Sequence, residues 1–117
     1  NFAAAYYNRA LTYHNLGDLN KAIGDYTQAI DIDPKDAKAY YNRANAYAKL
    51  GDASKALADY TQAIKFNPKL ANAYNNRAAT YIVLNDPKRA IKDAKKACEL
   101  GNCKVLRYLE NNKLSRD

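Results

Sequence analysis

The sequence repeats itself with a period of 34 residues. Sliding the chain against itself by that interval aligns Tyr6, Tyr40 and Tyr74, and the same shift aligns the asparagines and arginines that follow them. The first two units are identical at 21 of 34 positions, and the second and third at 12 of 34. A fixed period of this size is typical of stacked supersecondary units, each of which buries its apolar face mainly against its neighbours. The period therefore predicts units at about 3–36, 37–70 and 71–104, within a single domain spanning 1–117.

Each unit carries the pattern of two helices. In the first unit Tyr6, Ala10, Tyr13 and Leu16 follow one another at spacings of four, three and three, which places them along one side of an α-helix. Helical spacing returns between Ala22 and Ile30. The alanines allow two helix backbones to approach closely, and the tyrosines and leucines are expected to fill the remaining space.

The residues between the two predicted helices of each unit suit the end of the first helix and the start of the second. Gly17 and Gly51 can adopt the left-handed conformation that ends a helix. Asn85 holds this place in the third unit, and asparagine also tolerates that conformation. The next residue in each unit is an aspartate suited to the N-cap of the second helix, and Pro87 then occupies a first helical position.

These positions together resemble the tetratricopeptide repeat over residues 3 to about 104. The pattern comprises Tyr6, Ala10, Tyr13, Gly17, Ala22, Tyr26, Ala29 and Pro34, and it recurs from Tyr40 to Pro68. The resemblance implies an all-α fold, a right-handed α-α superhelix of three helix-turn-helix repeats. The third unit departs from the pattern, with Ala94 in place of a large aromatic residue and no proline near Asn102.

The segment after Gly101 is predicted to close the stack. Val105, Leu106 and Leu109 alternate with charged side chains, which indicates one amphipathic helix over about 103–114. A solenoid needs a terminal element that covers its last apolar face and turns polar groups outward. The two cysteines near this turn, Cys98 and Cys103, fit either two reduced apolar residues or a disulfide.

The composition argues against several classes of function. The sequence contains one histidine, His14, with no glycine-rich phosphate loop and no acid pair beside a nucleophile. We therefore expect no enzyme activity, no metal site and no cofactor. No apolar run approaches the ~20 residues that span a bilayer, so no membrane span is expected. The sequence indicates no particular cellular compartment.

The resemblance implies that the first helix of each unit lines a concave groove, where a protein or peptide partner would bind. The predicted peptide-binding residues are Tyr7, Asn8, Lys38, Tyr41, Asn42, Asn45, Lys49, Asn72, Asn75 and Asn76. Leu11, Asn15 and Ala79 fall on the same face. A side-chain amide both donates and accepts hydrogen bonds, so Asn8, Asn42 and Asn76 could pair with the backbone of an extended peptide. The alternative is that these asparagines are solvated or brace adjacent repeats.

Chaperone-binding members of the family clamp the terminal carboxylate of a peptide with lysines, asparagines and an arginine. Only Asn42 occupies an equivalent place here. Tyr7, Leu11, Asn72 and Asn76 stand where the other clamp residues would be. We therefore expect that this clamp is not assembled.

Arg9, Arg43 and Arg77 recur with aspartates 16 residues later, which indicates a repeated structural ion pair. The formal net charge is +7, and two alternative functions follow from the charge and the repeat ends. One is nucleic-acid association, which would weaken steeply with salt and which we consider the less favoured. It would use Lys38, Lys49, Lys88, Arg89, Lys92, Lys95 and Lys96. The other is a homo-oligomer formed through the ends of the repeat stack.

Overall fold

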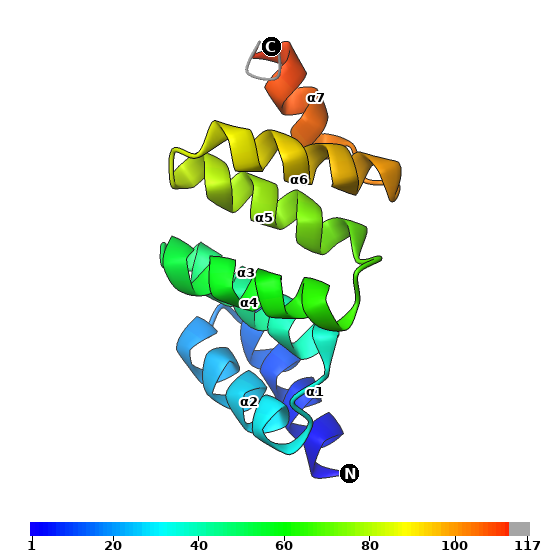
Figure 1. Cartoon of the computed structure of the whole chain (residues 1–117). Coiled ribbons are helices and arrows are strands. Elements are labelled where there is room, and N and C mark those ends of the chain that lie inside the picture. Colours follow the sequence, from blue (N-terminus) through cyan, green and yellow to red (C-terminus); the bar gives the residue numbers. More distant parts are fainter. Residues whose placement is uncertain (113–117) are drawn as a thin grey trace.

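The computed structural model describes residues 1–112, and that range is folded into α-helices without strands. The helices are α1 (Phe2–Asn15), α2 (Leu19–Ile32), α3 (Ala37–Lys49), α4 (Ala53–Phe66), α5 (Ala71–Val83), α6 (Pro87–Glu99) and α7 (Lys104–Asn111). Figure 1 shows the hairpins stacked one above the next, with α7 at the far end from the N-terminus. The fold is an all-α solenoid, as predicted. The predicted end of the last helix, at Leu114, lies outside the described residues.

The helix ends follow the predicted chemistry. Gly17, Gly51 and Asn85 all have positive φ angles, of 84°, 83° and 60°. In each unit the next residue, an aspartate, caps the second helix, and its side chain accepts a hydrogen bond from the backbone N–H three residues later. Pro87 begins α6, where its missing N–H costs nothing.

Both helices of each hairpin carry fully buried alanines. They are Ala10 and Ala22 in the first unit, Ala44 and Ala56 in the second, and Ala78 and Ala90 in the third. Tyr26 and Tyr60 fill the space beside them in the first two units. The leucines do not share this core: Leu16 is 76% exposed, and Leu50 and Leu84 are also exposed. The prediction that they fill the core was wrong because they lie at the C-caps, where the backbone turns away from the core.

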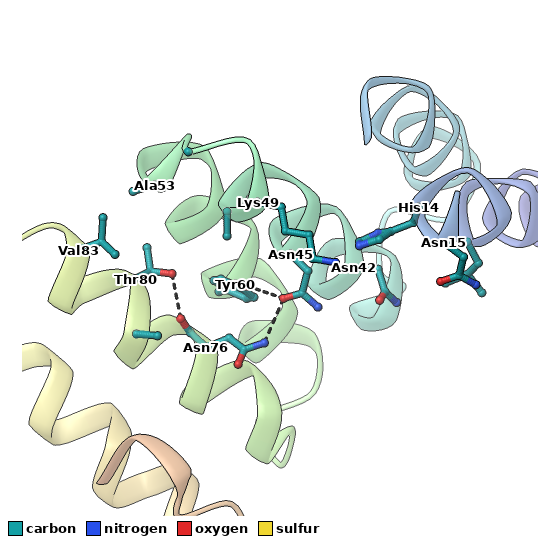
Figure 2. Close-up of a pocket in the computed structure, with 14 residues that line it drawn as sticks. His14, Asn15, Asn42, Asn45, Lys49, Ala53, Tyr60, Asn76, Thr80 and Val83 are labelled. Atoms are coloured by element: carbon teal, nitrogen blue, oxygen red, sulfur yellow. Dashed lines mark hydrogen bonds between the residues drawn. The ribbon is translucent and has the colours of Figure 1, made fainter. Parts of the chain in front are cut away.

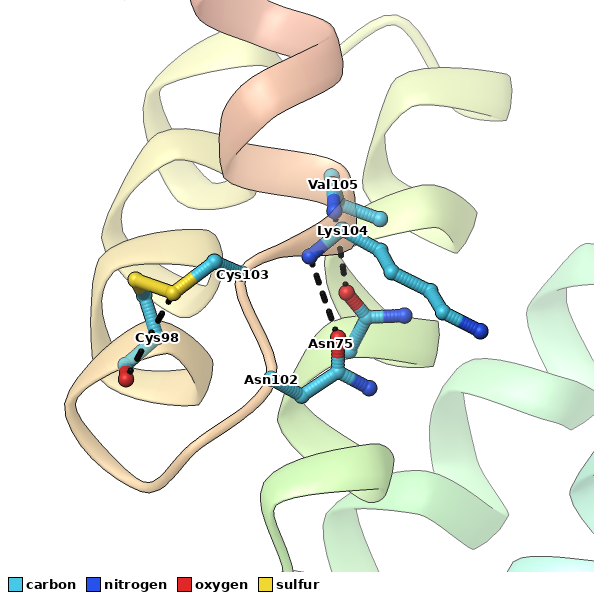
Figure 3. Close-up of a disulfide and its surroundings, with 6 residues drawn as sticks. All are labelled: Asn75, Cys98, Asn102, Cys103, Lys104 and Val105. Carbon is cyan, nitrogen blue, oxygen red and sulfur yellow. Dashed lines mark hydrogen bonds between the residues drawn. A yellow bond between two sulfur atoms is a disulfide. The ribbon is translucent and has the colours of Figure 1, made fainter.

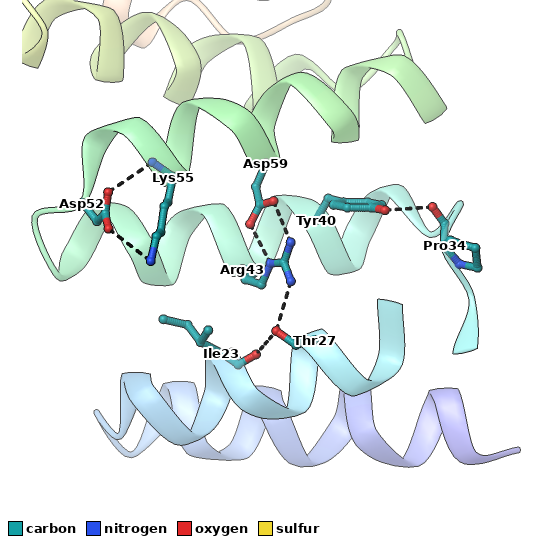
Figure 4. Close-up of polar contacts among 8 residues, drawn as sticks. All are labelled: Ile23, Thr27, Pro34, Tyr40, Arg43, Asp52, Lys55 and Asp59. Carbon is teal, nitrogen blue, oxygen red and sulfur yellow. Dashed lines mark hydrogen bonds and ion pairs between the residues drawn. The ribbon is translucent and has the colours of Figure 1, made fainter. Parts of the chain in front are cut away.

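The repeated arginine joins helices within and between units. Arg43 on α3 donates from Nε and a terminal nitrogen to both carboxylate oxygens of Asp59 on α4, at 2.7 and 2.9 Å. Its other terminal nitrogen donates to Thr27 Oγ1 of the preceding unit, at 3.0 Å (Figure 4). Arg77 makes the equivalent bonds to Asp93 and Thr61. The predicted ion pair is thus part of a joint between repeats.

The first unit has the ion pair but not the second half of the joint. Arg9 bonds Asp25 through two nitrogens, at 2.6 and 2.9 Å. Its side chain is 60% exposed, against 16% for Arg43 and 17% for Arg77. The difference arises because no helix of the described chain precedes α1 to cover it.

The last helix, α7, supplies the large apolar side chain that α6 of the third unit lacks. Ala94 leaves the place that Tyr26 and Tyr60 fill in the other units, and Leu109 of α7 is buried in the same cluster as Ala78 and Ala94. Cys98 and Cys103 form a disulfide between the end of α6 and the start of α7 (Figure 3).

The solenoid is elongated, with principal extents of 48 × 25 × 19 Å. Each helix packs mainly against the helices next to it in the chain, and α7 rests on both α5 and α6. No helix in the described part of the chain is both long and apolar enough to cross a membrane.

Candidate functional site

A groove of about 530 Å³ runs across all three units, along the face formed by α1, α3 and α5. Four of the predicted peptide-binding residues line it, namely Asn42, Asn45, Lys49 and Asn76 (Figure 2). The other lining residues are Leu11, His14, Asn15, Ala48, Gly51, Ala53, Tyr60, Ala79, Thr80 and Val83. The groove therefore brings these four predicted residues onto one concave surface.

Asn42 and Asn76 each brace two repeats. The Asn42 amide nitrogen donates to the hydroxyl of Tyr7 in the preceding unit, at 2.9 Å, and to the carbonyl oxygen of Lys38. The Asn76 amide nitrogen donates to the Tyr41 hydroxyl at 3.2 Å. The amide nitrogens of Asn42 and Asn76 therefore brace adjacent repeats, as the alternative interpretation held, and their partners are the hydroxyls of Tyr7 and Tyr41. Within residues 1–112 the Asn42 Oδ1 atom accepts no hydrogen bond and remains available to a peptide N–H.

Asn45 lies at the centre of the polar network. Its Oδ1 accepts from the Asn76 amide at 3.0 Å and from the hydroxyl of Tyr60, which rises from α4. Tyr60 is 2% exposed, and its burial raises the pKa of the phenol above its usual value. The hydroxyl is therefore protonated at neutral pH and acts as a fixed donor that holds Asn45 in place.

Two predicted residues instead hold the closing helix. Asn75 is 7% exposed, and its Oδ1 accepts from the Val105 backbone N–H at the start of α7, at 3.0 Å (Figure 3). Its amide nitrogen donates to Asn76 Oδ1. Asn72 Oδ1 accepts from Asn102 in the same turn, at 2.8 Å. Asn8 and Lys38 are exposed outside the groove lining.

Sequence reasoning missed several residues of the groove. Tyr60 was missed because the family resemblance assigns the groove to first helices, whereas Tyr60 reaches it from α4. Ala48 and Ala53 were missed because an alanine carries no chemical signal of binding. His14, to which the sequence analysis assigned no binding role, lines the groove, and its Nδ1 lies 3.4 Å from the Tyr26 hydroxyl.

His14 and Lys49 point toward one another from neighbouring units (Figure 2). Burial lowers the pKa of His14 from its usual value of 6.5, and the positive charge of Lys49 lowers it further. The imidazole is therefore neutral at pH 7, and Lys49 is the only charged side chain lining the groove within residues 1–112.

This pKa shift predicts a pH-dependent stability. The folded chain binds a proton on His14 less tightly than the unfolded chain does. The contribution of neutral His14 to the free energy of unfolding is therefore complete above about pH 6.5, and it is lost as the pH falls through the pKa of the folded state. We expect thermal unfolding to show a lower midpoint at pH 5.5 than at pH 7.5. His14→Ala, which copies Ala48 of the second unit, should show a smaller difference. An equal loss in both proteins would contradict this account.

The basic cluster lies elsewhere, on α6. Lys88, Lys92 and Lys95, named above for nucleic-acid association, are exposed there. Arg89 pairs with Asp86 at 2.8 Å and Lys96 with Glu99 at 3.9 Å, so part of this charge is balanced locally. Among residues 1–112 no three His, Cys, Asp or Glu side chains are grouped so that they could hold a metal ion.

Family models match the chain in three places. A model described as TPR repeat matches residues 13–51, and two models described as tetratricopeptide repeat match residues 37–70 and 59–92. No curated protein matches the chain significantly.

Solved structures with the same fold include several TPR domains. The first TPR of Spaghetti (RPAP3), bound to HSP90 peptide SRMEEVD, is 29% identical with a TM-score of 0.90, over 98% of this chain and 91% of that one. The Arabidopsis OM64 TPR domain is 28% identical with a TM-score of 0.89, over 95% and 96% of the two chains. The second TPR of Spaghetti, bound to the same peptide, is 28% identical with a TM-score of 0.83, over 86% and 93%.

Proposed function

Because the chain belongs to the tetratricopeptide repeat family, we propose that it is a non-catalytic interaction scaffold whose concave groove holds an extended segment of a partner protein. The observation that carries the proposal is the open groove of about 530 Å³, which receives side chains from the first helices of all three units. The two Spaghetti TPR domains support it, since both were solved with a bound peptide.

The polar groups of the groove suit a peptide backbone. Asn42 offers a free Oδ1 to a backbone N–H, while the network from Tyr60 through Asn45 to Asn76 keeps the neighbouring amides in fixed positions. A groove that is already ordered spends little conformational entropy on binding. Each such hydrogen bond contributes only about 0.5–1.5 kcal/mol, so we expect micromolar affinity unless apolar burial adds to it.

The binding mode differs from a clamp for a terminal carboxylate. Such a clamp needs several basic groups, whereas Lys49 is the one lysine or arginine lining the groove in the described chain. Asn72 and Asn76, at two of the clamp positions, are neutral and bonded to other side chains. We therefore propose an internal peptide segment, rather than a chain terminus, as the ligand.

Replacing Asn42 with alanine tests the groove. Peptides would first be selected on the wild-type protein from a random library displayed on phage, and their affinities measured by fluorescence anisotropy. We expect Asn42→Ala to weaken binding by about threefold to tenfold, because one hydrogen bond to the peptide is lost.

Asn8→Ala is the matched control, since Asn8 occupies the same place in the first unit but lies outside the groove lining. Circular dichroism would verify that both variants remain helical, because Asn42 also bonds Tyr7. Selected peptides that bind wild type and Asn42→Ala with equal affinity would refute the groove as the site, as would a selection that yields no binding peptide.

A further inference from the structure

The groove is chemically divided. The part formed by the first unit is lined by Leu11, His14 and Asn15. The part formed by the second and third units is lined by small apolar side chains beside the ring of Tyr60. These are Ala48, Ala53, Ala79 and Val83. The amide and hydroxyl groups in this second part, on Asn45, Asn76 and Tyr60, already bond to one another.

The three alanines that line the groove are smaller than the residues at the same positions of the first unit. The positions of Ala48, Ala53 and Ala79 are held in the first unit by His14, Leu19 and Leu11. Together with Val83, these three alanines line an apolar part of the groove, here called the hollow. Ala48 and Ala79 are exposed, and Val83 is 76% exposed at its edge.

Lys49 stands beside this hollow with an uncompensated charge. It makes no ion pair with any side chain among residues 1–112, and no aspartate or glutamate lines the groove in that range. The neutral imidazole of His14 neighbours it from the first unit (Figure 2). A carboxylate on the ligand is the complementary group for this position.

We infer that the hollow formed by Ala48, Ala53, Ala79 and Val83 is a side-chain subsite for one bulky apolar residue of the bound peptide, and that Lys49 selects an acidic residue beside it. This inference rests on the proposed function and specifies its ligand class: an extended segment in which a leucine, isoleucine or phenylalanine lies within a few residues of an aspartate or glutamate. Apolar burial in the hollow supplies the affinity that the backbone hydrogen bonds lack.

Selection from the same random phage library tests the inference. Peptides enriched on the wild-type protein should combine a bulky apolar and an acidic residue. Ala79→Leu restores the side chain found at Leu11 and should fill the hollow, so it should abolish the apolar preference and weaken the selected peptides by about tenfold or more. Lys49→Glu should replace the acidic preference with a basic one while the apolar preference remains.

Ala58→Leu is the matched control, because Ala58 is exposed on α4 outside the groove and should leave selection unchanged. Ala48→Leu provides a second filling variant should Ala79→Leu lose its helical signal. The inference is overturned if the enriched peptides lack the apolar and acidic pair, or if filling the hollow has no more effect than Ala58→Leu. If peptides without that pair still depend on Asn42, the proposed function stands and only this specificity fails.

Discussion

Replacing Arg43 with methionine is expected to lower the free energy of unfolding by about 3 kcal/mol, measured by urea denaturation. The substitution leaves the Asp59 carboxylate, whose residue is 5% exposed, without its two charged hydrogen-bond donors, and it removes the bond to Thr27 in the preceding unit. A buried charge without a partner is costly because water cannot replace the lost hydrogen bonds.

Two further variants identify the cause of that loss. Arg9→Met removes the same ion pair in the first unit, where the arginine is 60% exposed and makes no bond to a preceding threonine, so it should destabilise the protein clearly less. The double variant Arg43→Met/Asp59→Leu should recover much of the stability, because it removes the unpaired carboxylate as well. Equal losses for Arg9→Met and Arg43→Met would show that the joint between repeats contributes nothing.

Enlarging Ala44 is expected to be similarly disruptive. Ala44 is completely buried where α3 meets α4, against Ala56 and Tyr60, so a leucine there must push the two helices apart. Overpacking of this kind costs about 1–3 kcal/mol, and the upper end applies because the neighbouring backbone is close. The thermal midpoint of Ala44→Leu should fall by several degrees.

The same helix provides the control for this experiment. Ala48 lies one turn further along α3 and is exposed in the groove, so Ala48→Leu should leave the thermal midpoint nearly unchanged. A loss of stability in Ala48→Leu as large as that in Ala44→Leu would mean that the hollow is absent. The pair therefore tests the core and the geometry of the groove together.

The helices and their ends were predictable because their determinants are local. A helix stop needs a residue that tolerates positive φ, so Gly17, Gly51 and Asn85 reveal the turns without any knowledge of the tertiary structure. The pairing of Arg43 with Asp59 was likewise readable from a constant spacing. The exposure of Leu16 was not, since helical periodicity continues the apolar stripe through a residue at which the helix has already ended.

The groove was predictable only in part, because binding surfaces depend on contacts between units. Helical position alone places Tyr7 and Tyr41 beside the asparagines, but only the packing of repeats shows that Asn42 and Asn76 donate to these hydroxyls. The role of Asn75 in holding α7 depends on a turn whose path the sequence does not specify. The spacing of Cys98 and Cys103 left two chemical states open, and the structure bonds them.

The packing of each helix mainly against its sequence neighbours has a consequence for how the chain acquires this shape. Folding requires no closure of long loops, because the helices that contact one another most are consecutive in the chain. A hairpin that forms anywhere in the stack can act as the template on which the adjacent hairpin folds, so folding can start at any repeat and spread to its neighbours.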